Sequence, residues 1–422
     1  MLDIGSIIKL QRTKRNMTQE ELSAGIVSLS YLSKIENQKA KANPEIIQSL
    51  CNRLDIELVE TPDIQLEEKC KQWYDILYDR FDKEEMIAKF EELQEVMNRS
   101  INDQTIMFEI HQIRYYVVLR DLKRALHKMN ELHEMADSFN STHKYYWNKF
   151  KGNYYSFKEK PQQSLQCYQQ AEKTIRLADI NESEVADLHY AISIEYSKLL
   201  NGLETINYAN KAMVVFQQEY NFVRCAQCHI LLGISYRRIR INELALENYN
   251  QAMYLGKLSN NKDVIQLVYL NLGRFYSTIG DLKHSTKNYL LALNTADLNF
   301  EIKLDVFASL IQNFYQNKEY TQAKEYLQLG KEVLSLAQGK EYYKFYHYTL
   351  QVYTHLLNEE LNKLIVVLED AFLPYLKHKK DYRHLVFYAV LIASQFEKVG
   401  KYKKSTQYYK LANSNYDQLI KW

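Results

Sequence analysis

The sequence predicts an all-α protein in which a small N-terminal domain of short helices is followed by a long array of paired helices. Its 422 residues include only 11 glycines and 4 prolines, a composition typical of long helices joined by short turns. A chain of this length is also too long for one compact core. Small and aromatic residues recur at fixed spacing, as at Gly233, Tyr236, Ala245, Tyr249 and Ala252.

This spacing of small and aromatic residues appears in three further segments. They are Gly152, Tyr155, Ser164, Tyr168 and Ala171; Gly273, Tyr276, Ser285, Tyr289 and Ala292; and Ala393, Phe396, Ser405, Tyr409 and Ala412. Small residues let two antiparallel helices approach closely, and the aromatic rings fill the seam between them. The pattern resembles the tetratricopeptide repeat (TPR).

The tight-packing position of this pattern can be followed through most of the chain. Small or apolar residues occupy it near positions 76, 113, 152, 191, 233, 273, 311, 351 and 393. The spacing is longer than the usual TPR period of about 34 residues, which indicates extended helices or connections. Residues 67–422 are therefore expected to form a right-handed TPR superhelical solenoid of about nine helix pairs with a concave inner face.

Residues 1–58 do not follow the repeat and predict several short helices. The first helix has an apolar face between Ile4 and Leu10. Thr18 and Glu21 have capping-box spacing, which opens a second helix running to Ile26. Another helix begins at Asn43-Pro44, with proline at its first position. Residues 59–66, which contain Pro62, are the expected linker to the array.

Two segments, Thr18–Leu22 and Ser30–Asn37, resemble the helix-turn-helix of the phage-repressor (XRE) type. The short turn between Ile26 and Ser28 is similar to that of PlcR-like peptide-sensing regulators. The resemblance implies that the second helix of the motif enters the major groove of a double-stranded DNA operator. The expected DNA-binding residues are Gln19, Ser28, Leu29, Ser30, Tyr31, Lys34, Asn37 and Lys39.

The chemistry of these residues supports DNA reading. Lys34 can reach guanine acceptors, Ser30 can bond to several bases, and Leu29 can contact a thymine methyl group. Residues 1–42 hold seven basic and four acidic side chains. Phosphate contacts supply much of the affinity for DNA, so this small excess favours a homodimer that reads two half-sites. The alternative is a helical domain that serves protein contacts only.

Polar residues follow the tight-packing position on successive first helices of the array, where they would face the concave side; they are Arg114, Asn153, Arg238, Arg274, Gln312 and Gln316. Asn271 is a further candidate, because it lies three residues before Arg274 and shares its helix face. Amide groups can pair with the backbone of an extended peptide, and arginine can pair with its carboxylates. We therefore expect a short linear signalling peptide of roughly five to ten residues that carries at least one carboxylate. A solvated face with no ligand is the alternative.

Other motifs predict little chemistry. Cys225, Cys228 and His229 match the spacing of a haem-attachment motif, but they lie inside a repeat helix, where both thiols would pack. Neither metal-ligand spacing nor a catalytic motif is present, so we expect no cofactor, no metal and no enzyme activity. No apolar run approaches 18 residues and no export signal is visible, so we expect a cytoplasmic protein without membrane contact.

A helix-turn-helix followed by a long TPR array resembles the RRNPP family of quorum-sensing regulators, and the repeat number resembles its NprR-like members. The resemblance implies a transcription regulator controlled by a short peptide bound in the concave face. Two alternatives stay open. One is a Rap-like interaction module that binds a response-regulator protein in sporulation control. The other is an arbitrium-type phage lysogeny receptor with the same architecture.

Overall fold

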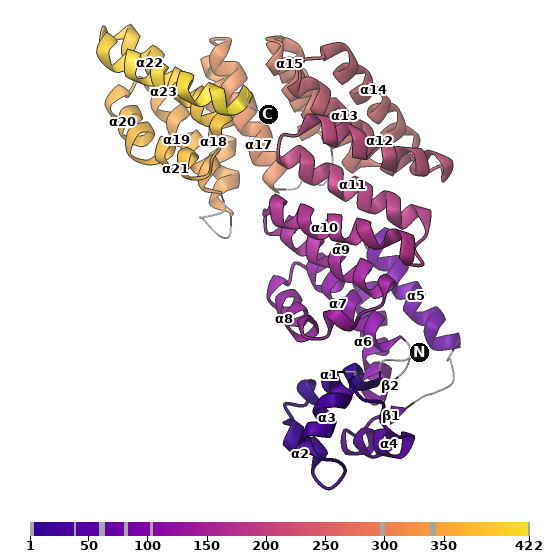
Figure 1. The fold of residues 1–422 in the computed structure, drawn as a ribbon. Helices are drawn as coiled ribbons and strands as arrows, with labels where there is room; N and C mark the ends of the chain where they lie inside the picture. The colour runs from indigo at the N-terminus through magenta and orange to yellow at the C-terminus, as the bar shows by residue number, and fades with distance from the viewer. Residues whose placement is uncertain are drawn as a thin grey trace. The chain divides into compact units, whose positions relative to one another are not determined.

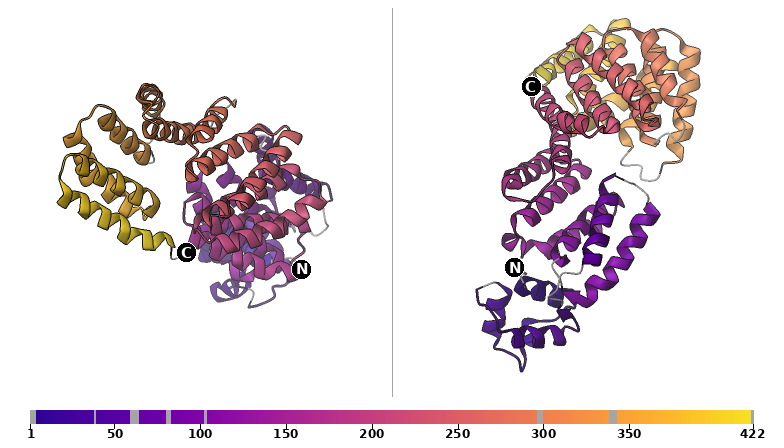
Figure 2. Two further views of the ribbon diagram at one scale, coloured as in Figure 1. Left: turned by 90° about the horizontal axis from the view of Figure 1, so that it is seen from above. Right: turned by 90° about the vertical axis from the view of Figure 1, so that its right-hand side faces the viewer.

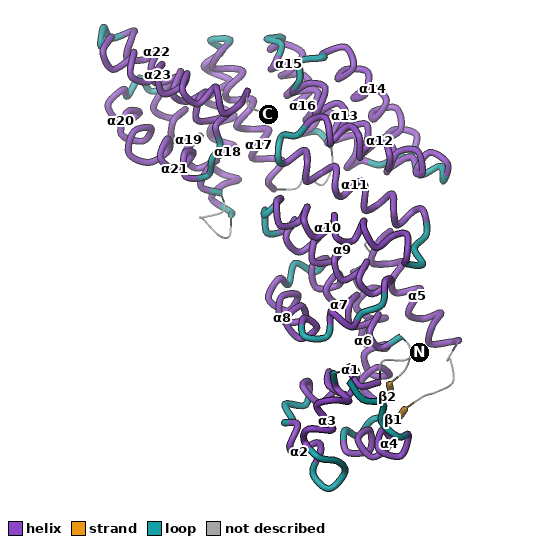
Figure 3. The backbone as a smooth tube through the Cα atoms, in the orientation of Figure 1, coloured by secondary structure: helices purple, strands orange, loops and turns teal. Residues whose placement is uncertain are grey.

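The computed structural model describes residues 4–37, 39–58, 64–79, 83–101, 104–295, 300–337 and 343–420 (Figures 1 and 3). The chain divides into two compact units, Met1–Leu199 and Leu200–Trp422. Among the described residues almost all regular structure is helical, as predicted. None of the described helices is long and apolar enough to cross a membrane.

The first unit begins with four short helices and continues with longer helices. Its elements are α1 (Ile4–Lys14), α2 (Gln19–Ser23), α3 (Leu29–Glu36), α4 (Pro44–Arg53), β1 (Glu57–Leu58), α5 (Ile64–Asp79), α6 (Lys83–Arg99), β2 (Ser100–Ile101), α7 (Thr105–Val118), α8 (Leu122–His133), η1 (Ala136–Ser138), α9 (Ser141–Phe157), α10 (Pro161–Thr174), η2 (Ile175–Leu177) and α11 (Glu182–Lys198).

The second unit is helical throughout its described residues, and its later helix pairs follow a curve from α15 to α23 (Figure 2). Its elements are α12 (Gly202–Gln218), α13 (Phe222–Arg238), α14 (Asn242–Leu258), α15 (Lys262–Thr278), α16 (Leu282–Leu293), α17 (Phe300–Gln316), α18 (Tyr320–Ser335), α19 (Lys344–Leu357), α20 (Leu361–Val366), the π-helical turn η3 (Val367–Phe372), α21 (Leu373–His378), α22 (Tyr382–Lys398) and α23 (Tyr402–Ile420).

The prediction of nine helix pairs is confirmed for the described part of the array. In chain order, the helices α5 to α23 give nine successive first and second helices, with α20, η3 and α21 together as the second helix of the eighth pair; α11 ends the first unit and α12 begins the second. Pro374 lies in this interrupted helix, where its missing N–H removes a helical hydrogen bond. Each predicted tight-packing position falls within the first helix of its pair.

The small residues pack as the repeat pattern predicted. A Cβ atom at Gly152 would lie 2.3 Å from Cε1 of Tyr168, and one at Gly233 would lie 2.5 Å from Cε1 of Tyr249. Only glycine therefore lets these helices meet. Tyr409 in the last repeat differs, because it is 39% exposed instead of filling a seam.

The N-terminal helices follow local sequence signals, with one correction. The capping box is present, since the Thr18 amide donates to Glu21 Oε2 at 2.6 Å and the Glu21 amide donates to Thr18 Oγ1 at 3.1 Å. The second helix ends at Ser23 and not at Ile26 as predicted. Gly25, in the left-handed region with φ +71°, turns the chain soon after this end.

The N-terminal domain is joined to the first repeats in two ways. Glu57 and Leu58 of β1 pair in parallel with Ser100 and Ile101 of β2. One continuous hydrophobic core also runs from α1 through the helices α5–α9. The predicted linker 59–66 is too long at its C-terminal side, because α5 begins at Ile64. Residues 59–63, including Pro62, lie outside the described residues.

Candidate DNA-reading helix and peptide-binding face

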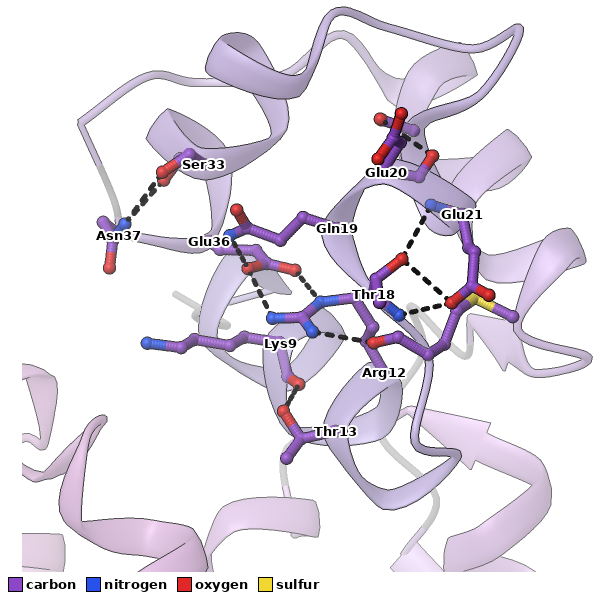
Figure 4. A network of polar contacts seen from close by, with 12 residues as sticks. Lys9, Arg12, Thr13, Thr18, Gln19, Glu20, Glu21, Ser33, Glu36 and Asn37 are labelled. Atoms are coloured by element: carbon purple, nitrogen blue, oxygen red, sulfur yellow. Dashed lines mark hydrogen bonds and ion pairs between the residues drawn. The ribbon is translucent and has the colours of Figure 1, made fainter.

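The helix predicted to enter DNA, α3, is anchored by a buried carboxylate at its C-terminal end (Figure 4). Glu36 is only 2% exposed. It accepts two bonds from Arg12 on α1, at 2.7 Å from Nε and 3.0 Å from Nη2, and one from Gln19 Nε2 at 2.6 Å. These bonds tie α1, α2 and α3 into one body and leave the N-terminal part of α3 facing outward.

Six of the eight predicted DNA contacts are exposed. Ser28 caps α3, Leu29 is 50% exposed, and Ser30, Lys34, Asn37 and Lys39 are also exposed. A helix end with this exposure can present hydroxyl, ammonium and apolar groups to base edges.

Three of the eight predicted DNA contacts, including the exposed Asn37, already have partners within the domain. Gln19 donates to Glu36, Tyr31 Oη donates to the Lys41 carbonyl at 3.2 Å, and Asn37 Nδ2 donates to the Ser33 carbonyl at 2.8 Å. Gln19 thus contributes to positioning α3, and Arg12 does so as well, although the sequence analysis missed that role. A buried glutamate on an otherwise apolar helix face needs a basic partner, which is the signal that could have identified Arg12.

In the first unit, two predicted peptide contacts lie together. When the Asn153 amide is oriented to satisfy all its neighbours, its oxygen accepts from Arg114 Nη1 at 3.1 Å. Its nitrogen then donates to Tyr168 Oη at 2.8 Å and to the Lys149 carbonyl at 3.1 Å. Arg114 Nε is buried and has no hydrogen-bond partner among the described residues. Asn153 is therefore held in place, and Arg114 keeps a donor for a further group.

In the second unit, four guanidinium groups converge from three helices; we call Arg237, Arg238, Arg274 and Arg383 the arginine cluster. The pKa of Arg238 is lowered to about 10 by desolvation, and then by repulsion from Arg237, Arg383 and Arg274. Desolvation also lowers the pKa of Arg383, together with repulsion from Arg237 and Arg274. Arg238 and Arg383 nevertheless keep exposed surface, so the surroundings desolvate them without closing the cluster to ligands.

Two carboxylates act on this cluster. Arg274 Nη2 lies 2.5 Å from Asp305 Oδ2, and the Asp381 carboxylate offsets part of the repulsion that lowers the pKa of Arg383. Burial lowers the pKa of Arg274, but the Asp305 carboxylate outweighs that effect and the pKa is raised. Nearby, Asn271 Nδ2 donates to the Leu267 carbonyl at 2.8 Å, while Asn271 Oδ1 is buried without a partner among the described residues. The cluster thus retains a positive excess that suits an anionic ligand.

An apolar groove of about 510 Å³ adjoins the arginine cluster through Arg383. We use "apolar groove" for the surface between α17, α19, α22 and α23. It is lined by Tyr315, Gln316, Tyr353, Arg383, Val386, Phe387, Val390, Leu391, Ser394, Gln395, Lys398 and Tyr416. Gln316 is thus one of the predicted contacts, whereas Gln312 is half-buried on α17 and does not line the groove. The shape and composition suit apolar side chains next to a charged group.

Sequence reasoning missed Arg237 and Arg383. Arg237 is buried beside Tyr249, although it directly follows the predicted frame. Arg383 is the second residue of α22, outside the positions that the repeat marks as concave. Only the curvature of several repeats brings α22 near α13, and a sequence period does not encode that curvature.

The haem-like motif has a packing role. Cys225 and Cys228 are buried in α13, and burial raises the pKa of Cys228 to about 12. His229 Nδ1 lies 2.8 Å from Asn248 Oδ1. Among the described residues no group of three or more potential metal ligands occurs.

Comparisons with known proteins agree with this architecture. A family model described as helix-turn-helix matches residues 8–60. The chain is 32% identical over 402 residues to the transcriptional activator NprA of Geobacillus stearothermophilus, which covers 93% of this chain and 98% of that protein. It is 23% identical over 358 residues to response regulator aspartate phosphatase I of Bacillus subtilis (strain 168), covering 82% of this chain and 88% of that protein.

Two solved structures share the fold. The apo form of the quorum sensor NprR from B. thuringiensis matches with a TM-score of 0.69 at 19% identity, covering 83% of this chain and 98% of that one. A Rap protein complexed with Competence and Sporulation Factor matches with a TM-score of 0.69 at 17% identity, covering 85% of this chain and 99% of that one.

Proposed function

We propose, from the premise that this chain belongs to the RRNPP family together with the transcriptional activator NprA, that it regulates transcription by binding an operator under the control of a short peptide. The arginine cluster beside the apolar groove is the observation that carries the peptide part of this proposal. The anchored and exposed helix α3 carries the DNA part.

The proposed ligand is a linear peptide that combines a carboxylate with apolar side chains. The carboxylate, from Asp, Glu or the C-terminus, binds in the arginine cluster, because charge-assisted bonds to guanidinium are strong in desolvated surroundings. The apolar side chains occupy the groove beyond Arg383. Asn271 Oδ1 can accept a bond from the peptide backbone, since it has no partner among the described residues.

Calorimetry tests this site. Synthetic heptapeptides that contain apolar residues and one carboxylate are screened by thermal shift, and binders are titrated on wild type and on Arg274→Ala. Losing the guanidinium should weaken binding by ~1.5–3 kcal/mol, the usual range for a bond to a charged group. Arg176→Ala, an exposed arginine of the first unit, is the matched control and should bind as wild type. Equal affinity in Arg274→Ala would exclude the cluster as the carboxylate site.

Asn153 lies in the first unit and is tested by a variant of its own. Asn153→Ala should weaken peptide binding by ~1–3 kcal/mol if its amide pairs with the ligand backbone. Unchanged affinity would mean that the bonds of Asn153 to Tyr168 and Arg114 are its whole role.

DNA binding is tested by selecting duplexes from a random pool with the full chain. Lys34→Ala and Ser30→Ala should each weaken the selected duplex by ~1–3 kcal/mol and relax its sequence preference. Identical affinity and preference in both variants would exclude readout by the outer side of α3.

Such a regulator is proposed to work as a homodimer in the cytoplasm and to catalyse no reaction itself.

A second candidate function is binding of a response-regulator protein. The likeness to response regulator aspartate phosphatase I across most of the chain favours it. Pull-down with purified response-regulator receiver domains, with and without a bound heptapeptide, distinguishes the two functions. Capture of a receiver domain without any selected DNA would favour this second candidate.

A further inference from the structure

A buried ion cluster links the N-terminal domain to the first repeats. Glu109 on α7 is 1% exposed and pairs with Lys14 of α1 on one side. On the other side it accepts from Lys128 of α8 at 2.8 Å. We call Lys14, Glu109 and Lys128 the Glu109 cluster. Two of its members belong to the array, and Lys14 is its contribution from the N-terminal domain.

The Glu109 cluster is charged at neutral pH. Burial alone would raise the pKa of Glu109, but the Lys14 and Lys128 ammonium groups outweigh burial and lower the pKa to about 2. A buried carboxylate without its partners would be strongly unfavourable, so the geometry around it is restricted. The position of α1 against α7 and α8 is therefore fixed by more than apolar contact.

Further contacts join the same two parts. The β1–β2 pairing ties the end of the N-terminal domain to the end of α6. Ser6 Oγ lies 3.3 Å from Ser138 Oγ, and Lys9 Nζ lies 3.0 Å from Glu134 Oε2 at an exposed site. The N-terminal domain is thus attached at both ends of its chain.

The position of α1 also determines the position of α3. A Cβ atom at Gly5 would lie 2.1 Å from the Ile35 carbonyl oxygen, so the two helix backbones are in direct contact. At the other end of α1, Arg12 holds Glu36. A chain of contacts therefore runs from Glu109 through Lys14 and α1 to the DNA-facing helix.

We infer that Glu109 is a positioning residue for DNA reading: by holding Lys14, it fixes the N-terminal domain and the first repeats as one rigid body, so that the array sets the orientation of α3. The inference rests on the proposed DNA binding. According to this inference, the first repeats, and not the linker alone, determine the orientation in which α3 meets DNA.

Spin labels on the full chain test the rigid body without DNA. Labels are attached at Gln48→Cys on α4 and Lys123→Cys on α8, both exposed positions. The background carries Cys167→Ser, since the other four cysteines are buried. Wild type should give one narrow distance distribution. Lys14→Met and Glu109→Gln should broaden it about twofold or more, because the domain then moves relative to α8.

Matched variants separate this role from general stability. Lys128→Met keeps the Lys14–Glu109 contact and should keep the narrow distribution, even if it lowers the melting temperature. Glu134→Gln removes the exposed pair with Lys9 and should also leave it narrow. If Glu109→Gln does not fold, the distance distribution of Lys14→Met tests the inference, because this variant leaves Glu109 paired with Lys128. A narrow distribution in Lys14→Met would overturn the inference.

A DNA measurement then tests the consequence for reading. Duplexes selected by wild type are prepared with one and with two half-sites. Lys14→Met should weaken the two-site duplex roughly tenfold, since a loosely held domain lowers the effective concentration at the second site. Affinity for one half-site should not change. Equal weakening of both would mean that Lys14 contacts DNA directly and would overturn positioning. If no duplex is selected, the proposed function is wrong, and the spin-label distances still decide the docking.

Discussion

Removal of Arg383 should stabilise the protein while impairing its anion site. A pKa lowered from 12.5 to about 10 at Arg238 corresponds to on the order of 3 kcal/mol of unfavourable interaction with its charged form. Desolvation is the largest cause, and three arginines share the remainder. Solvent screens the exposed part of Arg238, so we expect Arg383→Ala to relieve only ~0.5 kcal/mol. For a unit of this size the melting temperature should rise by about 1–2 °C at low salt.

The anion response should change in the opposite direction. Sulfate at low millimolar concentration should raise the melting temperature of wild type by binding the arginine cluster, and it should raise that of Arg383→Ala less. Lys398→Ala is the matched control, because Lys398 lies on the same helix and lines the same groove but is not in the cluster. A lower melting temperature for Arg383→Ala, with a sulfate response equal to that of Lys398→Ala, would refute the mutual repulsion on which the ligand assignment depends.

Three further changes have defined outcomes. The pKa of Glu109 is depressed from 4.5 to about 2, so the ionised carboxylate stabilises the folded state above about pH 4.5. This stabilisation is lost as the pH falls towards 2. The difference in free energy of unfolding between wild type and Glu109→Gln, measured with urea, should therefore narrow over that interval. Gly233→Ala should destabilise the folded protein by ~1–3 kcal/mol, because the new Cβ atom would overlap the ring of Tyr249. Gly202→Ala should be neutral or stabilising in the same assay, because its Cβ atom would lie 3.6 Å from its nearest neighbour. Tyr249→Ala should lower the free energy of unfolding by ~3–5 kcal/mol because the ring is fully buried, whereas Tyr409→Ala should lower it by under about 1 kcal/mol because that ring is 39% exposed. Equal losses in the same assay would contradict this difference in packing.

The repeats were predictable from sequence because their decisive contacts are local. Gly233 and Tyr249 are sixteen positions apart, and the same pairing recurs at Gly152 with Tyr168. A close helix approach needs a small residue opposite a large one, and the sequence of each repeat contains both at fixed spacing. The capping box at Thr18 was predictable for the same reason. The docking of the N-terminal domain was not predictable from sequence, because Lys14 and Glu109 do not belong to any periodic pattern.

The candidate site residues also differ in whether a local sequence pattern could predict them. Arg238 and Arg274 follow the repeat frame, so one step of the array places them on neighbouring helices. Gln19 was predicted near phosphates but donates to Glu36, because a buried carboxylate needs every donor within reach. Its role depends on burial at a residue seventeen positions away, which a motif match does not report.

Arg383 joins the arginine cluster only through the summed rotation of the repeats between α13 and α22. Small changes at each repeat interface add up over this interval, so the distance between Arg383 and Arg238 is sensitive to the curvature of the second unit. Repulsion among the four guanidinium groups opposes the curvature that brings them together. A carboxylate bound among them would offset that repulsion and would favour the more curved form, since a ligand shifts a conformational equilibrium by binding its states unequally. The residue that sequence analysis could not find, Arg383, is therefore the one through which a bound peptide would couple its binding to the curvature of the second unit.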